Sequence, residues 1–493
     1  MRRGFDHEEY TRIQSQHIAE RISQFGGKLY LELGGKLFDD YHASRVLPGF
    51  NPDSKVQMFL KLKDQAELVI AINSNDIEKN KVRGDLGITY DADVLRLIDA
   101  FRGIGLYVGS VVLTRFEGQP SASAFMERLN KLGIKTYRHY PIPNYPADVN
   151  AVVSPEGFGR NEYIETTRPL VLVTAPGPGS GKMATCLSQL YHENLRGIKA
   201  GYAKFETFPV WDLSLNHPVN IAYEAATADL GDVNMIDPFH LEAYGVTTVN
   251  YNRDIEIFPV LKALFEHIYG SCPYQSPTDM GVNMIRRCIV DDDACREAGR
   301  TEILRRLYTA LVDQRKGKND GTEAEKIKLL MQKLSITDAD RPCIAAARAV
   351  EEATGEPALA IELEDGRVVT GKTGRLMGPS AALLLNAVKA LAGIDKEVEL
   401  ISPSVLEPIQ TLKTDYLGNR NPRLHSDEIL VALSICAATD ENAKKAMEQL
   451  PRLAGCEVHS TVILPETDSN IYRRLRTNLT CDPRYQAKTL YHK

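Results

Sequence analysis

The segment of the chain best suited to chemistry is a glycine-rich loop with a lysine at its end, residues 174–182 (TAPGPGSGK). It joins an apolar run at 170–174 to an amphipathic pattern at 181–194, which predicts a strand followed by a helix. Glycines allow close approach of backbone to phosphate oxygens, and a helix N-terminus supplies unpaired N–H groups. We therefore predict a phosphate-binding loop for a nucleotide, made of Gly177, Gly179, Ser180, Gly181 and Lys182.

The loop departs from both familiar nucleotide motifs. In the Walker pattern G-x-x-x-x-G-K-[ST], Pro176 replaces the first glycine, and Met183, which cannot bind Mg²⁺, follows the lysine. Thr185 is the next hydroxyl along the chain. In the dinucleotide pattern G-x-G-x-x-G the third glycine would fall on Lys182, although Glu206 follows the next strand where a ribose-binding acid would stand. The loop predicts phosphate binding without choosing between ATP and NAD(P).

A second group of reactive residues follows the strand expected at 201–205. Residues 205–218 contain the single tryptophan of the chain together with Glu206, Asp212 and His217. Glu206 or Asp212 would bind Mg²⁺, and His217 or Asp212 would act on the nucleophile as an acid or base. Aromatic packing with surface acids explains the same segment equally well.

Two further loops carry basic residues next to glycines. Lys36 ends the sequence Leu33–Lys36, which follows Glu32 at the end of a predicted strand. Lys372 and Arg375 lie in residues 370–380, a loop with three glycines in front of an apolar helix. We expect this second loop to bind an anion and to close with the first over one substrate.

Alternating strands and helices must position these residues. Candidate strands lie at 28–33, 67–72, 109–114, 135–139, 170–174, 201–205 and 246–251, with helical patterns at 54–63, 92–101, 121–132, 181–194 and 218–230. This alternation predicts an α/β fold with a doubly wound, mostly parallel sheet. Strands vanish between 254 and 334, and alternation then resumes with a hairpin at 358–371 and strands at 398–402 and 458–464. We therefore expect a Rossmann-like domain at 1–253, a helical subdomain at 254–337 and a smaller α/β domain at 338–493.

Composition excludes several classes of protein. The net charge of −6 argues against broad binding to nucleic acid, and no apolar run is long enough to cross a membrane. The eight cysteines are scattered singly and the N-terminus has no apolar signal region, so we expect a cytoplasmic protein. There is no H-E-x-x-H motif, and we expect no protein-bound metal centre. A homo-oligomer is the usual state of such an enzyme.

Over nearly its full length the chain resembles a large bacterial family of conserved proteins without a known function. The resemblance rests on the glycine loop and on residues 28–36 (KLYLELGGK), 44–50 (SRVLPGF), 80–91 (NKVRGDLGITYD) and 421–425 (NPRLH). It implies an N-terminal Rossmann-like unit with a degenerate phosphate loop, a helical insert and a C-terminal unit similar in topology to cytidine deaminases. It implies no reaction, and the zinc signature of the deaminases is absent.

These residues together favour a nucleotide-dependent enzyme that transfers a phosphoryl or nucleotidyl group to a small anionic metabolite. ATP or another nucleotide, with Mg²⁺, would be the cofactor. Two alternatives stay open: an NAD(P)-dependent oxidoreductase with Glu206 on the ribose, and a sensor that binds a nucleotide or phosphometabolite without turnover.

Overall fold

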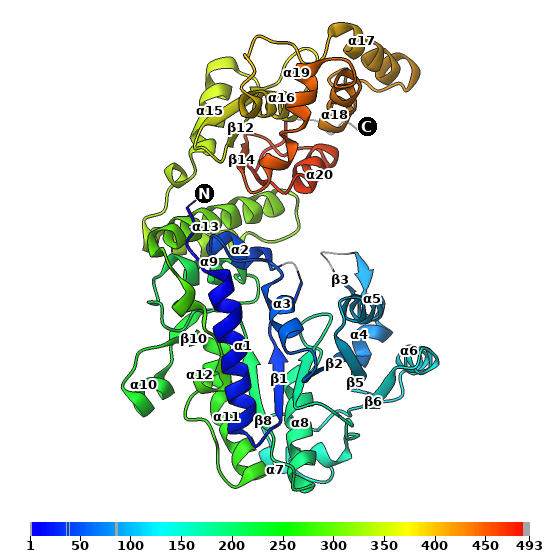
Figure 1. Ribbon diagram of the computed structural model, residues 1–493, viewed down its shortest axis with the longest axis vertical. Helices are drawn as coiled ribbons and strands as arrows, with labels where there is room; N and C mark the ends of the chain where they lie inside the picture. Colours follow the sequence, from blue (N-terminus) through cyan, green and yellow to red (C-terminus); the bar gives the residue numbers. More distant parts are fainter. Residues whose placement is uncertain (1, 36, 39, 84–86, 487–493) are drawn as a thin grey trace. The chain divides into compact units, whose positions relative to one another are not determined.

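The computed structural model describes residues 2–35, 37–38, 40–83 and 87–486. The chain forms two compact units (Figure 1). The N-terminal unit contains Arg3–Glu224 and Asp232–Arg296, and the C-terminal unit contains Glu297–Lys493 with the short segments Met1–Arg2 and Ala225–Gly231. The segment expected as one helical subdomain, 254–337, is therefore divided between the two units after Arg296.

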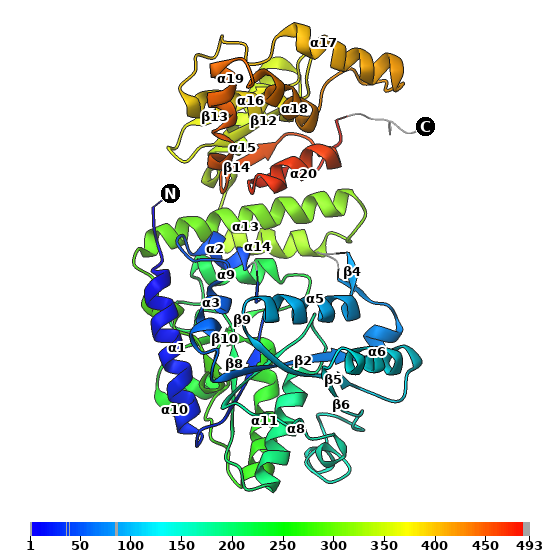
Figure 2. The same cartoon turned by 45° about the vertical axis from the view of Figure 1, so that its right-hand side comes forward.

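Within the described residues, a seven-stranded sheet forms the centre of the N-terminal unit (Figure 2). Its strands lie in the order β11-β8-β1-β7-β2-β5-β6. Every neighbouring pair in this sheet is parallel, which confirms the predicted α/β class. Its strands are β1 (Leu29–Leu33), β2 (Ala66–Asn73), β5 (Tyr107–Thr114), β6 (Lys135–Arg138), β7 (Leu170–Thr174), β8 (Gly201–Phe205) and β11 (Gly281–Val282).

Helices cover both faces of this sheet because side chains alternate between the faces along each strand. Leu29, Leu31 and Leu33 of β1 pack into one core, and Tyr30 packs into the other. The first core is completed by α1 (His7–Gln24), α3 (Ser54–Lys61), α5 (Tyr90–Gly103) and α6 (Pro120–Lys131). The second is completed by α7 (Val149–Val152), α8 (Lys182–Leu195) and α11 (Asn252–Tyr269).

The strand order creates a switch point between β7 and β2. After β7 the chain passes through α8 and enters β8, beyond β1, whereas after β2 it leads to β5 on the opposite side. Loops that leave two neighbouring parallel strands in opposite directions open a crevice at their carboxyl ends, where α/β proteins bind ligands. The glycine loop follows β7, so it stands at this crevice.

Two strands of the N-terminal unit differ from the predicted arrangement. The strand expected at 246–251 is β10 (Val249–Tyr251), which pairs antiparallel with β9 (Asn234–Ile236) outside the main sheet. The region thought to lack strands supplies β11 at the sheet edge. The remaining elements are α2 (Tyr41–Val46), α4 (Ser74–Glu78), β3 (Val82–Arg83), β4 (Ile88–Thr89), α9 (Pro218–Ala226), α10 (Pro238–Tyr244) and α12 (Pro277–Met280).

The C-terminal unit contains a smaller mixed sheet in the order β13-β12-β14-β15. Its strands are β12 (Ala358–Glu362), β13 (Val368–Lys372), β14 (Glu457–Ser460) and β15 (Asn478–Cys481). The predicted hairpin is confirmed, since β12 and β13 pair antiparallel. The strand predicted at 398–402 is wrong, because Leu400 and Ile401 enter the core from a turn.

Helices continue the chain from the N-terminal unit, and α15 and α16 pack on the second sheet. The helices are α13 (Asp292–Arg315), α14 (Thr322–Leu334), α15 (Pro342–Thr354), α16 (Pro379–Ala392), α17 (Pro403–Thr411), the π-helical segment η4 (Leu412–Tyr416), α18 (Ser426–Cys436), α19 (Glu441–Met447) and α20 (Glu466–Arg474). In the part of the chain that the structure describes, none of the helices combines the length and apolar character needed to span a membrane.

Candidate functional site

The glycine loop turns sharply from β7 into α8, and two of its glycines make the turn possible. Gly179 has φ of 74° and Gly181, the N-cap of α8, has φ of 86°. L-residues rarely adopt this left-handed conformation. A Cβ on Gly181 would also lie only 3.1 Å from the Thr114 side chain. The backbone therefore requires glycine at these positions.

Hydrogen bonds to its carbonyl groups hold the loop in place. Thr114 Oγ1 donates to the Ser180 carbonyl at 2.8 Å, and Ser180 Oγ donates to the Gly177 carbonyl at 2.8 Å. The loop is therefore held through its carbonyl oxygens, which accept these hydrogen bonds. The N–H groups in the first turn of an α-helix have no partner inside the helix, so those of α8 are available to an anion.

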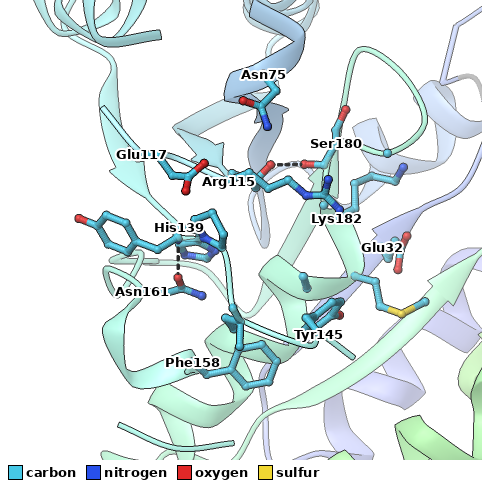
Figure 3. Close-up of a pocket in the computed structure, with 18 residues that line it drawn as sticks. Glu32, Asn75, Arg115, Glu117, His139, Tyr145, Phe158, Asn161, Ser180 and Lys182 are labelled. Carbon is cyan, nitrogen blue, oxygen red and sulfur yellow. Dashed lines mark hydrogen bonds between the residues drawn. The ribbon is translucent and has the colours of Figure 1, made fainter. Parts of the chain in front are cut away.

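The loop opens on a cavity of about 620 Å³ at the carboxyl edge of the sheet (Figure 3). This volume lies within the range of about 300–1,000 Å³ that small-molecule sites occupy. The lining residues are Glu32, Asn75, Thr114, Arg115, Glu117, His139, Tyr140, Pro141, Ile142, Tyr145, Phe158, Asn161 and residues 179–184.

Two cationic side chains, Lys182 and Arg115, line this cavity beside the loop (Figure 3). Neither makes an ion pair with any residue that the structure describes. Arg115 follows β5 with φ of 51°, which is unfavourable for a residue with a side chain. Such strain persists where the surrounding structure fixes it, and it concentrates at functional sites.

A buried carboxylate, Glu32, also lines the cavity. It stands near the carboxyl end of β1, the strand next to β7. The Tyr202 hydroxyl donates to Glu32 Oε2 at 2.7 Å and fixes the orientation of the carboxylate. Among the described residues, no three His, Cys, Asp or Glu side chains are grouped as ligands of a metal ion.

The cavity contains one histidine, His139, which follows β6. Its Nε2 lies 3.2 Å from the Glu162 carbonyl oxygen, so Nε2 carries the proton and Nδ1 is left as an acceptor. Burial lowers the pKa of His139 to about 3. At neutral pH the ring is uncharged and a weak base, suited to accepting a hydrogen bond more than to removing a proton.

The opposite end of the cavity is mostly apolar. Ile142, Tyr145 and Phe158 form this wall, and Phe158 is fully buried. Asn161 stands beside them, where its Oδ1 accepts from Tyr140 N at 2.8 Å and its Nδ2 donates to Ser188 Oγ at 3.0 Å. The cavity therefore combines a cationic end with an apolar end, as a ligand with a phosphate group and a ring system requires.

The structure brings together only part of the predicted site. Gly179, Ser180, Gly181 and Lys182 line the cavity. Gly177 does not line the cavity. A Cβ there would lie 2.4 Å from Tyr90 Oη, so glycine at this position allows the Tyr90 side chain to pack against the loop. The Thr185 hydroxyl is buried and donates to the Gly181 carbonyl at 2.9 Å instead of facing the cavity.

Glu206, expected on a ribose or Mg²⁺, lies outside the cavity lining. Its Oε1 is 3.1 Å from Lys204 Nζ, and Lys204 also pairs with Asp254 at 2.7 Å. Burial raises the pKa of Glu206 to about 7 although Lys204 opposes this shift. Glu206 therefore belongs to a neighbouring ionic cluster.

The two residues predicted to be catalytic, His217 and Asp212, also lie outside the cavity lining. His217 is 1% exposed, its Nδ1 accepts from Val219 N at 3.2 Å, and its Nε2 is 3.2 Å from Asp292. Burial lowers the pKa of His217 to about 4. Asp212 is exposed. The structure gives His217 packing and hydrogen-bonding partners and leaves it no contact with the cavity.

The remaining predicted residues lie elsewhere. Lys36 falls outside the described residues. Lys372 and Arg375 belong to the C-terminal unit, whereas all residues that line the cavity belong to the N-terminal unit. The sequence reasoning missed Arg115, which directly follows the strand predicted at 109–114, and His139, the last residue of the strand predicted at 135–139. Both stand at carboxyl ends of parallel strands, where ligand sites lie.

The fold and this cavity define a doubly wound α/β protein with a glycine-rich loop at the switch point of its sheet. The chain matches the family model described as "Domain of unknown function DUF1846, N-terminal" at residues 3–335 and that described as "Domain of unknown function DUF1846, C-terminal" at residues 339–491. It is 59% identical over 492 residues to a UPF0371 protein of Streptococcus thermophilus, with 100% of both chains covered. UPF0371 proteins of Corynebacterium efficiens and Streptococcus pneumoniae are 59% and 58% identical, again over 100% of both chains. The chain belongs to this uncharacterised bacterial family, as its resemblance implied.

Proposed function

We propose that the cavity binds a nucleotide and that the protein is an enzyme that transfers a phosphoryl or nucleotidyl group to a small anionic metabolite. One observation carries the proposal. The loop Gly179-Ser180-Gly181 and Lys182, at the N-terminus of α8, opens on a cavity that also contains Arg115.

The cationic end of the cavity has the features that phosphates need. Backbone N–H groups and the helix dipole would bind the phosphate oxygens. Lys182 would neutralise a terminal phosphate, and Arg115 would bind a second anionic group by paired N–H donors. Phosphoryl transfer depends chiefly on positioning and charge stabilisation, so these groups meet its main requirement.

Glu32 is the carboxylate best suited to assist a metal–nucleotide complex. Mg²⁺ is usually bound by one or two carboxylates together with phosphates and water. Glu32 reaches the cavity from the strand beside the glycine-loop strand and is held by Tyr202. Glu32 would therefore take the role that the sequence suggested for Glu206 or Asp212.

The two alternative functions differ from this proposal in what the cavity must do. An oxidoreductase would need an acid on the ribose, and Glu206 is paired with Lys204 outside the cavity. A sensor would need binding without turnover, and the low pKa of His139, about 3 because of burial, suits that role.

A thermal-shift screen separates these functions. ATP, GTP, NAD and NADP would each be added with Mg²⁺ to the wild type and to Lys182→Ala, with Lys131→Ala, an exposed residue of α6, as the matched control. We expect ATP or GTP to raise the melting temperature of the wild type and the control only. Stabilisation by NAD alone would support the oxidoreductase. Stabilisation by ATP or GTP without product in a separate turnover assay would support the sensor.

We also propose that the protein acts in the cytoplasm as a homo-oligomer. All eight cysteines, which lie among the described residues, are free thiols, as a reducing compartment would maintain them. Closed symmetric assemblies are the usual state of soluble enzymes.

A further inference from the structure

The C-terminal unit contains a histidine–aspartate pair. His425, the N-cap of α18, has its Nδ1 3.0 Å from Asp468 Oδ2. The imidazole is about one quarter exposed, with a side-chain exposure of 27%. Because Nδ1 faces a carboxylate, Nδ1 carries a proton and the tautomer is fixed. Nε2 is the ring nitrogen that does not face Asp468.

Asp468 is held firmly in this arrangement. It is 4% exposed, and its Oδ1 accepts from both the backbone N–H and the hydroxyl of Ser426, at 2.8 and 2.7 Å. Burial would raise the pKa of Asp468, but the hydrogen bonds from His425 and Ser426 outweigh burial and keep the pKa below its usual value. The carboxylate is therefore charged and favours a charged imidazole.

A second glycine-containing loop, within residues 370–380, leads into α16 and runs directly beside His425. The Gly378 N–H donates to the Leu424 carbonyl at 3.0 Å, and the Leu424 N–H donates to the Leu376 carbonyl at 3.0 Å. These bonds bring together the segments that lead into two long helices, α16 and α18. In the first turn of α18 the Ser426 N–H is bound to Asp468 Oδ1, so the N–H groups left for an anion come chiefly from the first turn of α16.

Cationic side chains are concentrated on these two segments. Arg423 Nε donates to the Gly374 carbonyl at 3.0 Å, which leaves its two terminal nitrogens for another acceptor. Lys372 and Arg375 are exposed and make no ion pair with any described residue. Ser380, in the first turn of α16, is 1% exposed, and its hydroxyl has no hydrogen-bond partner among the described residues.

We propose that the C-terminal unit contains its own binding site for a phosphate monoester, in which His425, oriented by Asp468, donates from Nε2 to the phosphate. Arg375 and Arg423 neutralise the second negative charge of the phosphate. The site does not depend on nucleotide binding in the N-terminal cavity.

A phosphate monoester suits this set of donors better than a single carboxylate does. It carries between about −1.5 and −2 charges at pH 7 and offers three strong acceptor oxygens. The hydrogen bond to Asp468 raises the pKa of His425 although burial opposes the shift, and this favours the charged ring that donates from Nε2. Lys413 of η4 disfavours this charge and Glu428 of α18 favours it.

Glycerol phosphate, which has no nucleobase, tests the proposal on the full chain. The protein would be labelled at histidine Cε1, and the signal of His425 assigned by its loss in His425→Gln, among eleven histidines. We expect glycerol phosphate to shift the His425 signal at pH 6.5. Arg375→Gln should weaken binding about tenfold, which is the usual effect of losing one charged hydrogen bond. Asp468→Asn should lower the pKa of His425 and move binding to lower pH.

Lys182→Ala provides the control, because it alters the cavity of the N-terminal unit only. The His425 shift should persist in this variant with an unchanged midpoint. An unmoved His425 signal in the wild type would overturn the proposal. So would binding that survives in His425→Gln and Arg375→Gln but disappears in Lys182→Ala, since glycerol phosphate would then occupy the cavity alone.

Discussion

At the scale of single residues, the cavity depends on side chains that the loop and strand ends bring into one place. Lys182 follows the glycine loop, Arg115 follows β5 and His139 follows β6. The sequence indicated the loop because glycine spacing before a helix is a local signal. It did not indicate Arg115 or His139, since their convergence depends on strand order, which no local pattern contains.

Gly181 offers a test of the loop geometry. Gly181→Ala should destabilise the protein by about 1–2 kcal/mol, because an L-residue is strained in the left-handed region. The contact with Thr114 at 3.1 Å should add to this cost. Urea unfolding of the purified variant measures the loss.

Gly197→Ala is the matched control for this variant. Gly197 has φ of 69° and open space around its Cβ position, so its substitution carries the backbone strain without the contact. Equal destabilisation of the two variants would show that the contact with Thr114 contributes nothing.

At the scale of elements, the sequence predicts central strands well. β7 and β8 have the predicted bounds, and the apolar run of β7, buried on both sides, marks a central parallel strand. β11 has two residues and lacks a pattern of its own. β15 contains Asn478 and Thr480, whose polar side chains interrupt the apolar signal and instead bind partners from the C-terminal unit.

The start of α15 is fixed to the smaller sheet by a buried ion pair. Arg341 is 1% exposed, its Nε donates to Glu457 Oε2 at 3.0 Å, and its Nη1 donates to Thr480 Oγ1 at 2.6 Å. Removing Arg341 leaves the buried Glu457 carboxylate with one cationic partner, Arg305 Nε at 3.1 Å, and costs up to about 3–5 kcal/mol. We therefore expect Arg341→Ala to destabilise the C-terminal unit by this amount.

Limited proteolysis measures this effect for each unit separately. Cleavage in Arg341→Ala should accelerate within the C-terminal unit, whereas Arg452→Ala, which removes an exposed pair with Glu364, should change little. A cleavage rate equal in the two variants would contradict the assigned importance of the buried pair.

At the scale of the whole molecule, buried neutral histidines predict how stability depends on pH. Burial lowers the pKa of His139 to about 3 and that of His217 to about 4, both below the unfolded value of about 6.5. Between these values the unfolded chain binds more protons than the folded chain, so stability rises with pH. Acidification below about pH 6.5 should therefore destabilise the protein by up to about 1.4 kcal/mol per pH unit for each histidine.

Urea unfolding at pH 7, 6 and 5 tests this dependence. His139→Asn should unfold with a smaller loss of stability on acidification than the wild type. The same slope in both proteins would mean that His139 is not buried in its neutral form. His425 acts in the opposite sense: the hydrogen bond to Asp468 raises its pKa, so its contribution is present below about pH 6.5 and is lost as pH rises through the folded value.

The sequence predicts the fold class of the whole chain better than it predicts how the chain divides into units. The α/β class and the second, smaller sheet follow from alternating patterns, and the structure confirms both. The expected helical subdomain is divided between the two units after Arg296, because helical periodicity does not indicate against which sheet a helix packs.

The most direct test of the central proposal is calorimetric titration of the full chain with Mg²⁺–ATP. The wild type and Lys131→Ala should bind with the same affinity. Lys182→Ala and Arg115→Ala should each bind about ten- to a hundredfold more weakly, since each loses a charged contact to phosphate. Equal affinity in all four proteins, or no binding to the wild type, would contradict the assignment of the glycine-loop cavity as a nucleotide site.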